Sequence, residues 1–174
     1  IQESTISVMF ESTGRCRVAS GRWMGPYTGV IVNEPRSLDV DHMVPLANAH
    51  RSGGWAWSRD RKAAYANNLD YEGHLNATTA SANRSKGSDG PEDWQPPDRG
   101  YWCQYAGDWV TIKSAWGLTA TEREWSALRE MLDTCVEPVD VEVTYATGGS
   151  TMAPPLPTGG ASFPEYDPNG PDRN

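Results

Sequence analysis

The sequence predicts an α+β fold, with short strands in its first half and two helices in its second half. Short β-branched stretches alternate with turn residues up to residue 42, and apolar residues recur at helical spacing between 102 and 132. From residue 139 onward Gly, Pro, Thr and acidic residues dominate. The 174-residue chain therefore fits one domain, at 1–136, followed by a linker-like tail at 137–174.

The elements before residue 100 follow from local composition. Strands are expected at 5–10, 29–32, 37–40 and 74–80, with a turn at 25–29. Ser58 is a suitable N-cap for a helix at 58–69. Another helix is expected to begin near 81 and to be broken soon after residue 87 by a Gly- and Pro-rich stretch.

The C-terminal half predicts an antiparallel pair of helices. Gly117 is a natural stop for the first helix, and Thr121 with Glu124 forms a capping box for the second. The apolar residues of the first helix are assigned to the core rather than to a base-stacking surface: Trp102, Tyr105, Ala106, Trp109, Ile112 and Trp116.

Two of the three cysteines lie at the ends of this helical pair. Cys103 near the start of one helix lies close to Cys135 at the end of the other, which favours a disulfide that closes the hairpin. Such a bond indicates an oxidising compartment. The alternative is two buried free thiols, and Cys16 has no obvious partner.

The formal net charge of −8 argues against a nucleic-acid partner, but its distribution weakens that objection. From Glu137 onward there are six acidic residues and one basic residue. Between 36 and 86 there are seven Lys or Arg and five Asp or Glu. The acidic whole therefore contains a mildly basic centre that is able to bind phosphate.

Three short segments carry residues suited to metal-assisted hydrolysis. Asp41-His42 ends a strand, His74 opens another, and Asn83 lies on the helix that follows. A carboxylate and an amide oxygen suit a hard ion such as Mg²⁺ or Mn²⁺, and a neutral imidazole can deprotonate water. Arg84 and Lys86, close to Asn83, are suited to holding phosphate oxygens.

These segments resemble a known family. "HLNATTASANRSKG" at 74–87 has the spacing of the second half of the HNH nuclease motif, and "DVDHMVPL" at 39–46 is similar to the first half. With "GPEDWQPP" and the two cysteines in order, residues 14–135 resemble the secreted, GmrSD-type branch of HNH endonucleases. The resemblance implies a ββα-metal (HNH) core at about 36–90 inside a mainly helical domain.

The resemblance also implies roles for individual residues. His42 is the general base, Asp41 and Asn83 hold one divalent cation, Mg²⁺ first and Mn²⁺ as the alternative, and His74 stands where the family has a base-orienting Asn. Arg84, Lys86 and Arg51 are assigned to the substrate backbone. The zinc-binding C-x-x-C pairs of other HNH branches are missing, and the tail "YDPNGPDRN" resembles the start of an excalibur-like module.

The expected protein is a secreted, monomeric endonuclease that acts on DNA in preference to RNA and does not insert into a membrane. A bacterial source is expected because Asn83-Arg-Ser has the form of an N-glycosylation site, and a glycan on Asn83 would destroy the metal site. Two alternatives stay open: a catalytically silent nucleic-acid-binding module, and a secreted structural domain.

Overall fold

The structure is a computed structural model that describes residues 4–11 and 17–135. Cys16 and the expected tail at 137–174 lie outside the described residues. The strands are β1 Met9–Phe10, β2 Val18–Ser20, β3 Trp23–Gly25, β4 Val30–Val32, β5 Leu38–His42 and β6 Leu75–Thr79. The α-helices are α1 Leu46–Arg51, α2 Arg59–Ala66, α3 Ala80–Lys86, α4 Trp102–Trp116 and α5 Glu122–Leu132. Four short 3₁₀ turns connect them: η1 Pro35–Ser37, η2 Gly54–Ala56, η3 Glu72–His74 and η4 Arg99–Tyr101.

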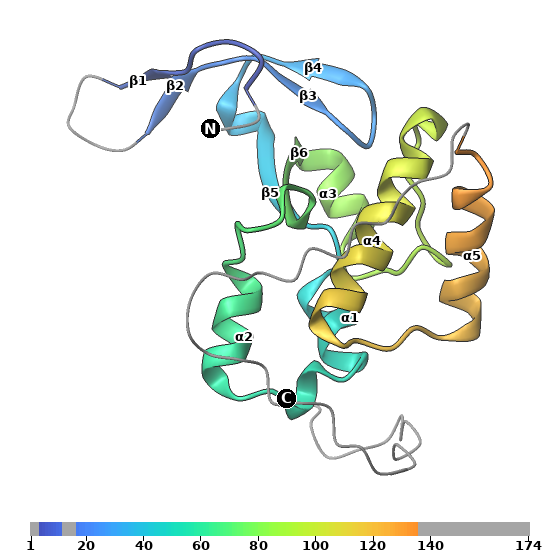
Figure 1. Cartoon of the computed structure of the whole chain (residues 1–174). Helices are drawn as coiled ribbons and strands as arrows, with labels where there is room; N and C mark the ends of the chain where they lie inside the picture. The colour runs from blue at the N-terminus through green and yellow to red at the C-terminus, as the bar shows by residue number, and fades with distance from the viewer. Residues whose placement is uncertain (1–3, 12–16, 136–174) are drawn as a thin grey trace.

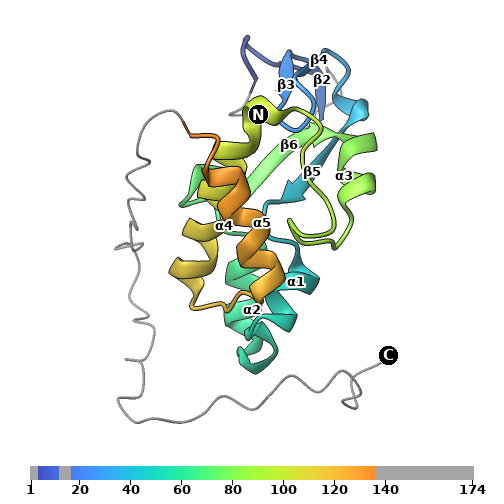
Figure 2. The same cartoon turned by 90° about the vertical axis from the view of Figure 1, so that its right-hand side faces the viewer.

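The described strands form three two-stranded antiparallel pairs, β1–β2, β3–β4 and β5–β6. The first two pairs lie at one end of the molecule and α1 and α2 at the other, with β5, β6 and α3 between them (Figure 1). Helices α4 and α5 lie side by side along one flank (Figures 1 and 2). The predicted mixture of small sheets and helices is therefore confirmed.

Several local signals in the sequence are confirmed by the structure. The Ser58 side chain accepts a hydrogen bond from the Arg61 amide, and Thr121 and Glu124 form the complete capping box of α5. Gly117 ends α4 with a φ of 65°, a left-handed conformation that favours glycine. The strand expected at 5–10 is only two residues long, and α1 was not expected from the sequence.

The core is built mainly from aromatic rings on and around α4. Tyr105 and Trp109 are completely buried there. The Trp109 indole donates to Glu124 of α5, whose carboxylate also pairs with the buried Lys113 ammonium at 2.5 Å. These contacts fix the two helices to each other. Within the described part of the chain, no helix is both long enough and apolar enough to cross a membrane.

The disulfide between Cys103 and Cys135 is present and joins the start of α4 to the residues just after α5. The two cysteines are 32 residues apart in the sequence, and their Cα atoms are 5.1 Å apart. The bond therefore closes the helical hairpin at its open end, as the sequence predicted.

Replacing both cysteines by alanine is expected to lower the free energy of unfolding by about 3–4 kcal/mol, because the unfolded chain regains the entropy of a 32-residue loop. Urea unfolding of the two proteins, followed by tryptophan fluorescence, measures the difference. A loss below about 1 kcal/mol would contradict this account and would show that the unfolded chain is already restricted without the bond.

Candidate functional site

The pairing of β5 with β6 arranges the acidic and histidine side chains of the motif. Asp39 and Asp41 are two residues apart and share one face of β5, whereas His42 belongs to the other face. In the register of the pair, Asp41 lies opposite Asn76 and His42 opposite Leu75. Helix α3 follows β6 directly and packs against both strands.

Asp41 is buried and held by two donors that converge on one oxygen. The Lys86 ammonium and the Tyr27 hydroxyl each lie 2.5 Å from Asp41 Oδ2. Lys86 also donates to the His42 carbonyl oxygen at 2.8 Å. The two side chains form a buried ion pair, and the two donors together fix the carboxylate in one orientation.

Asn83 lies one turn before Lys86 on α3 and meets a residue that the sequence analysis did not single out. Its Nδ2 donates to Asp39 Oδ2 at 3.2 Å, and the mostly exposed Arg84 lies 3.6 Å from the same oxygen. An ionised carboxylate only accepts, so Asp39 selects the amide orientation in which the Asn83 oxygen points elsewhere. The D-x-D spacing on β5, which places Asp39 on the same face as Asp41, is the signal in the sequence that could have identified it.

His42 is half-buried, and its ring is oriented by the end of α2. Its Nε2 lies 2.9 Å from the Ala66 carbonyl oxygen. Because a carbonyl only accepts, Nε2 carries the proton of the neutral ring and Nδ1 keeps a lone pair. This is the state that a general base requires.

His74 lies near His42, with ring centroids 6.1 Å apart, but it is almost completely buried. Its Nε2 donates to the Tyr65 carbonyl at 2.8 Å, and no described residue hydrogen-bonds to its Nδ1. The rings of Tyr65 and Trp116 pack against it. Burial lowers the pKa of His74, which favours the neutral ring. The ring packs edge-on against that of His42.

The three basic residues assigned to the substrate occupy different environments. Arg84 is mostly exposed, and Arg51 is exposed and donates to the Ser88 carbonyl at 3.1 Å. Lys86, in contrast, is completely buried against Asp41. Its ammonium group is not accessible to phosphate, so its placement differs from the substrate contact expected from the sequence.

The side chains expected to hold a cation have suitable chemistry for a hard ion. The hydrogen bonds described above use Oδ2 of Asp41 and Nδ2 of Asn83, and they do not use Oδ1 of either side chain. Carboxylate and amide oxygens are ligands that Mg²⁺ and Mn²⁺ accept, with water completing the shell. No group of three or more His, Cys, Asp and Glu suited to a metal ion occurs in residues 4–11 and 17–135.

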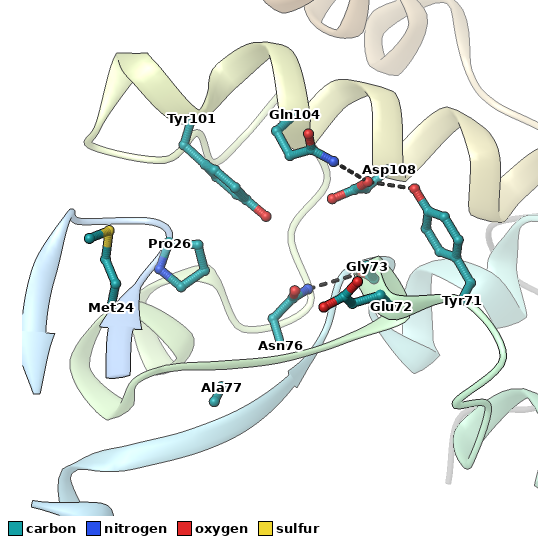
Figure 3. A pocket seen from close by; sticks show the side chains of 10 residues that line it. All are labelled: Met24, Pro26, Tyr71, Glu72, Gly73, Asn76, Ala77, Tyr101, Gln104 and Asp108. Atoms are coloured by element: carbon teal, nitrogen blue, oxygen red, sulfur yellow. Dashed lines mark hydrogen bonds between the residues drawn. The ribbon is translucent and has the colours of Figure 1, made fainter. Parts of the chain in front are cut away.

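A separate pocket of about 370 Å³ lies between β3, β6, η3 and α4. Figure 3 shows Asp108, one of its lining residues, accepting hydrogen bonds from Tyr71 and Gln104. Burial raises the pKa of Asp108. The described residues that line the pocket include acidic groups and no basic one, which makes the lining unsuited to a phosphate backbone.

An α+β domain with Asp41 and His42 adjacent on β5 and an exposed arginine on α3 is compatible with a nuclease-related protein. Residues 8–131 match the family described as GmrSD restriction endonucleases, C-terminal domain. The chain belongs to this family.

One relative is an uncharacterized secreted protein of the fungus Arthroderma benhamiae, 42% identical over 122 residues. The match covers 70% of this chain and 59% of the relative, so the chain spans less than two thirds of that protein. The relative is fungal, and the expected bacterial source is therefore not supported. No solved structure matches the chain.

Replacing Lys86 by methionine is expected to lower the free energy of unfolding by about 3–5 kcal/mol, because Asp41 would be left buried without its counter-charge. The matched control is Arg84→Met on the same helix, where an exposed pair contributes less than about 1 kcal/mol. Urea unfolding at pH 7 measures both. Equal small losses would contradict the assigned ion pair.

Stability is expected to fall as the pH drops below about 6.5, because the unfolded chain protonates His74 while the folded chain resists it. The contribution of this residue is at most about 1.4 kcal/mol per pH unit. Urea unfolding at pH 7.5 and 5.5 measures it, and His74→Gln should show a smaller drop. The exposed His50 provides the control, since His50→Gln should keep the wild-type drop. An unchanged drop in His74→Gln would contradict the assignment.

Proposed function

We propose that this protein is a secreted, metal-dependent HNH endonuclease that hydrolyses the phosphodiester bonds of DNA with low sequence specificity, with RNA as the alternative substrate. The products are a 5′ phosphate and a 3′ hydroxyl. Membership of a restriction endonuclease family supports a nucleic-acid substrate. The succession β5, β6 and α3 is what a ββα-metal core requires.

The observation that carries this proposal is the state of two adjacent residues on β5. His42 Nε2 donates to the Ala66 carbonyl, which leaves the lone pair on Nδ1. Asp41 is buried, and its Oδ2 accepts hydrogen bonds from Tyr27 and Lys86. A structural ion pair needs Asp41 and Lys86, but it does not need an imidazole beside them in the tautomer of a base. The arrangement therefore favours catalysis over binding alone.

In the proposed reaction, His42 Nδ1 takes a proton from water, and the water oxygen attacks phosphorus in line with the 3′ oxygen. The new P–O bond forms as the bond from phosphorus to the 3′ oxygen breaks, and the leaving oxygen takes a proton from solvent. The contact with Ala66 keeps the imidazole in place during the proton transfer.

Asp41 and Asn83 would hold the cation through their Oδ1 atoms. When bound, a divalent cation neutralises charge on the phosphate and on the leaving oxygen. Mg²⁺ is the proposed ion and Mn²⁺ the alternative. The His74 ring packs against the ring of His42 and stands at the position where the family carries an Asn.

Arg84 and Arg51 are the proposed phosphate contacts, because both are exposed. Such contacts position the backbone and carry no base readout, which is the reason for the low sequence specificity. Lys86 is not proposed as a phosphate contact, because its ammonium group is buried and paired with Asp41. Secretion is supported by the disulfide and by the fungal relative, which is named as a secreted protein.

The test is cleavage of supercoiled plasmid and of single-stranded DNA with Mg²⁺, Mn²⁺ or EDTA. Wild-type protein should cut with a divalent ion and not with EDTA, and His42→Ala should cut about 10²–10⁴-fold more slowly. The control is His50→Ala, an exposed histidine on α1, which should cut at the wild-type rate.

Equal cutting by wild type and His42→Ala would show that the base is wrongly assigned. If wild type does not cut DNA, the same series on RNA decides between another substrate and a silent binding module. Cutting that persists in EDTA would contradict the proposed metal dependence.

A further inference from the structure

Tyr27 donates a hydrogen bond to Asp41 but lies outside the two segments, 39–46 and 74–87, that resemble the HNH motif. It belongs to the turn between β3 and β4, 14 residues before Asp41, and it is completely buried. Its hydroxyl donates to Asp41 Oδ2 at 2.5 Å, the oxygen that also pairs with Lys86. Three separate segments, the β3–β4 turn, β5 and α3, therefore meet at one carboxylate oxygen.

The position of the Tyr27 ring is fixed before any ligand binds. Its ring centroid lies 5.3 Å from Trp94, 5.9 Å from Tyr101 and 5.8 Å from Tyr105. The Tyr27 carbonyl also accepts a hydrogen bond from the Asp98 amide at 3.0 Å. The hydroxyl is thus held by surrounding rings and backbone, and it can in turn hold Asp41.

Packing alone does not account for the contact between Tyr27 and Asp41. The neighbouring Tyr105 is also completely buried, yet no described residue hydrogen-bonds to its hydroxyl. This aromatic cluster therefore holds a buried tyrosine whose hydroxyl has no hydrogen-bond partner among the described residues. Lys86 already pairs with Asp41 Oδ2, so a second donor on the same oxygen is explained best by a need to hold the carboxylate in one orientation.

We infer that Tyr27 is a positioning residue of the metal site. Together with Lys86 it occupies Asp41 Oδ2, so that Oδ1 faces the cation; this inference rests on the proposed function. The β3–β4 hairpin is then part of the active site, although no residue of the motif lies in it. Outer contacts of this kind typically change metal affinity by about 10–100-fold when they are lost.

The test compares Tyr27→Phe with Tyr105→Phe. Each change removes one hydroxyl and keeps a buried ring of the same cluster, but of the two hydroxyls it is that of Tyr27 that donates to Asp41. Isothermal titration with Mn²⁺ should give a dissociation constant about 10–100-fold higher for Tyr27→Phe and unchanged for Tyr105→Phe. Thermal unfolding in EDTA shows whether each variant is folded.

Cleavage kinetics give a second measure that a purely structural role would not affect. The rate of Tyr27→Phe should rise toward the wild-type rate as Mn²⁺ is increased, whereas Tyr105→Phe should follow the wild-type curve throughout. If Tyr27→Phe does not fold, wild-type protein with ¹³Cζ-labelled tyrosine replaces it. Mg²⁺ should then shift the Tyr27 resonance and leave that of Tyr105 in place.

The outcomes separate this inference from the proposed function. Wild-type protein that binds Mn²⁺ while Tyr27→Phe binds equally well overturns the role of Tyr27 and leaves the nuclease proposal standing. An unmoved Tyr27 resonance in wild type that binds Mg²⁺ has the same meaning. Wild-type protein that binds neither ion overturns the metal site itself, and the role of Tyr27 with it.

Discussion

The buried ion pair between Asp41 and Lys86 is the contact on which the rest of the site depends. Removing two charges from water is costly, and the cost is offset only when both partners have their other hydrogen bonds satisfied. Lys86 meets this condition through the His42 carbonyl, and its ammonium also lies 5.6 Å from the centre of the Tyr27 ring. The pair fixes the last residue of α3 to β5 at Asp41, the residue directly before His42.

Short-range features of this fold were predictable because their causes are local. The capping box of α5 and the left-handed Gly117 each depend on residues within one turn. Helix α1 was missed because it has only six residues, follows Pro45 and has no side-chain cap. Its residues become helical through burial of Asn48 and Ala49, which the sequence does not display.

The members of the candidate site could be named from the sequence, but most of their partners could not. Asp41, His42 and Asn83 follow from spacing on a strand and a helix. Lys86 is buried beside the ring of Tyr27, which comes from a hairpin distant from it in the sequence, and lysine is rarely buried completely. The oxygen that orients His42 belongs to the backbone of Ala66, and a backbone atom leaves no signature in residue type.

The segment between β5 and β6 carries α1, α2 and η3, so the two strands that bear the site pair only across a long helical insertion. Closing a loop of this length delays pairing relative to local helix formation. The carbonyl that orients His42 and the buried His74 both come from this insertion or its end. A partly folded chain therefore keeps Asn83 apart from Asp41 and His42, and any hydrolytic activity would first appear when folding is complete.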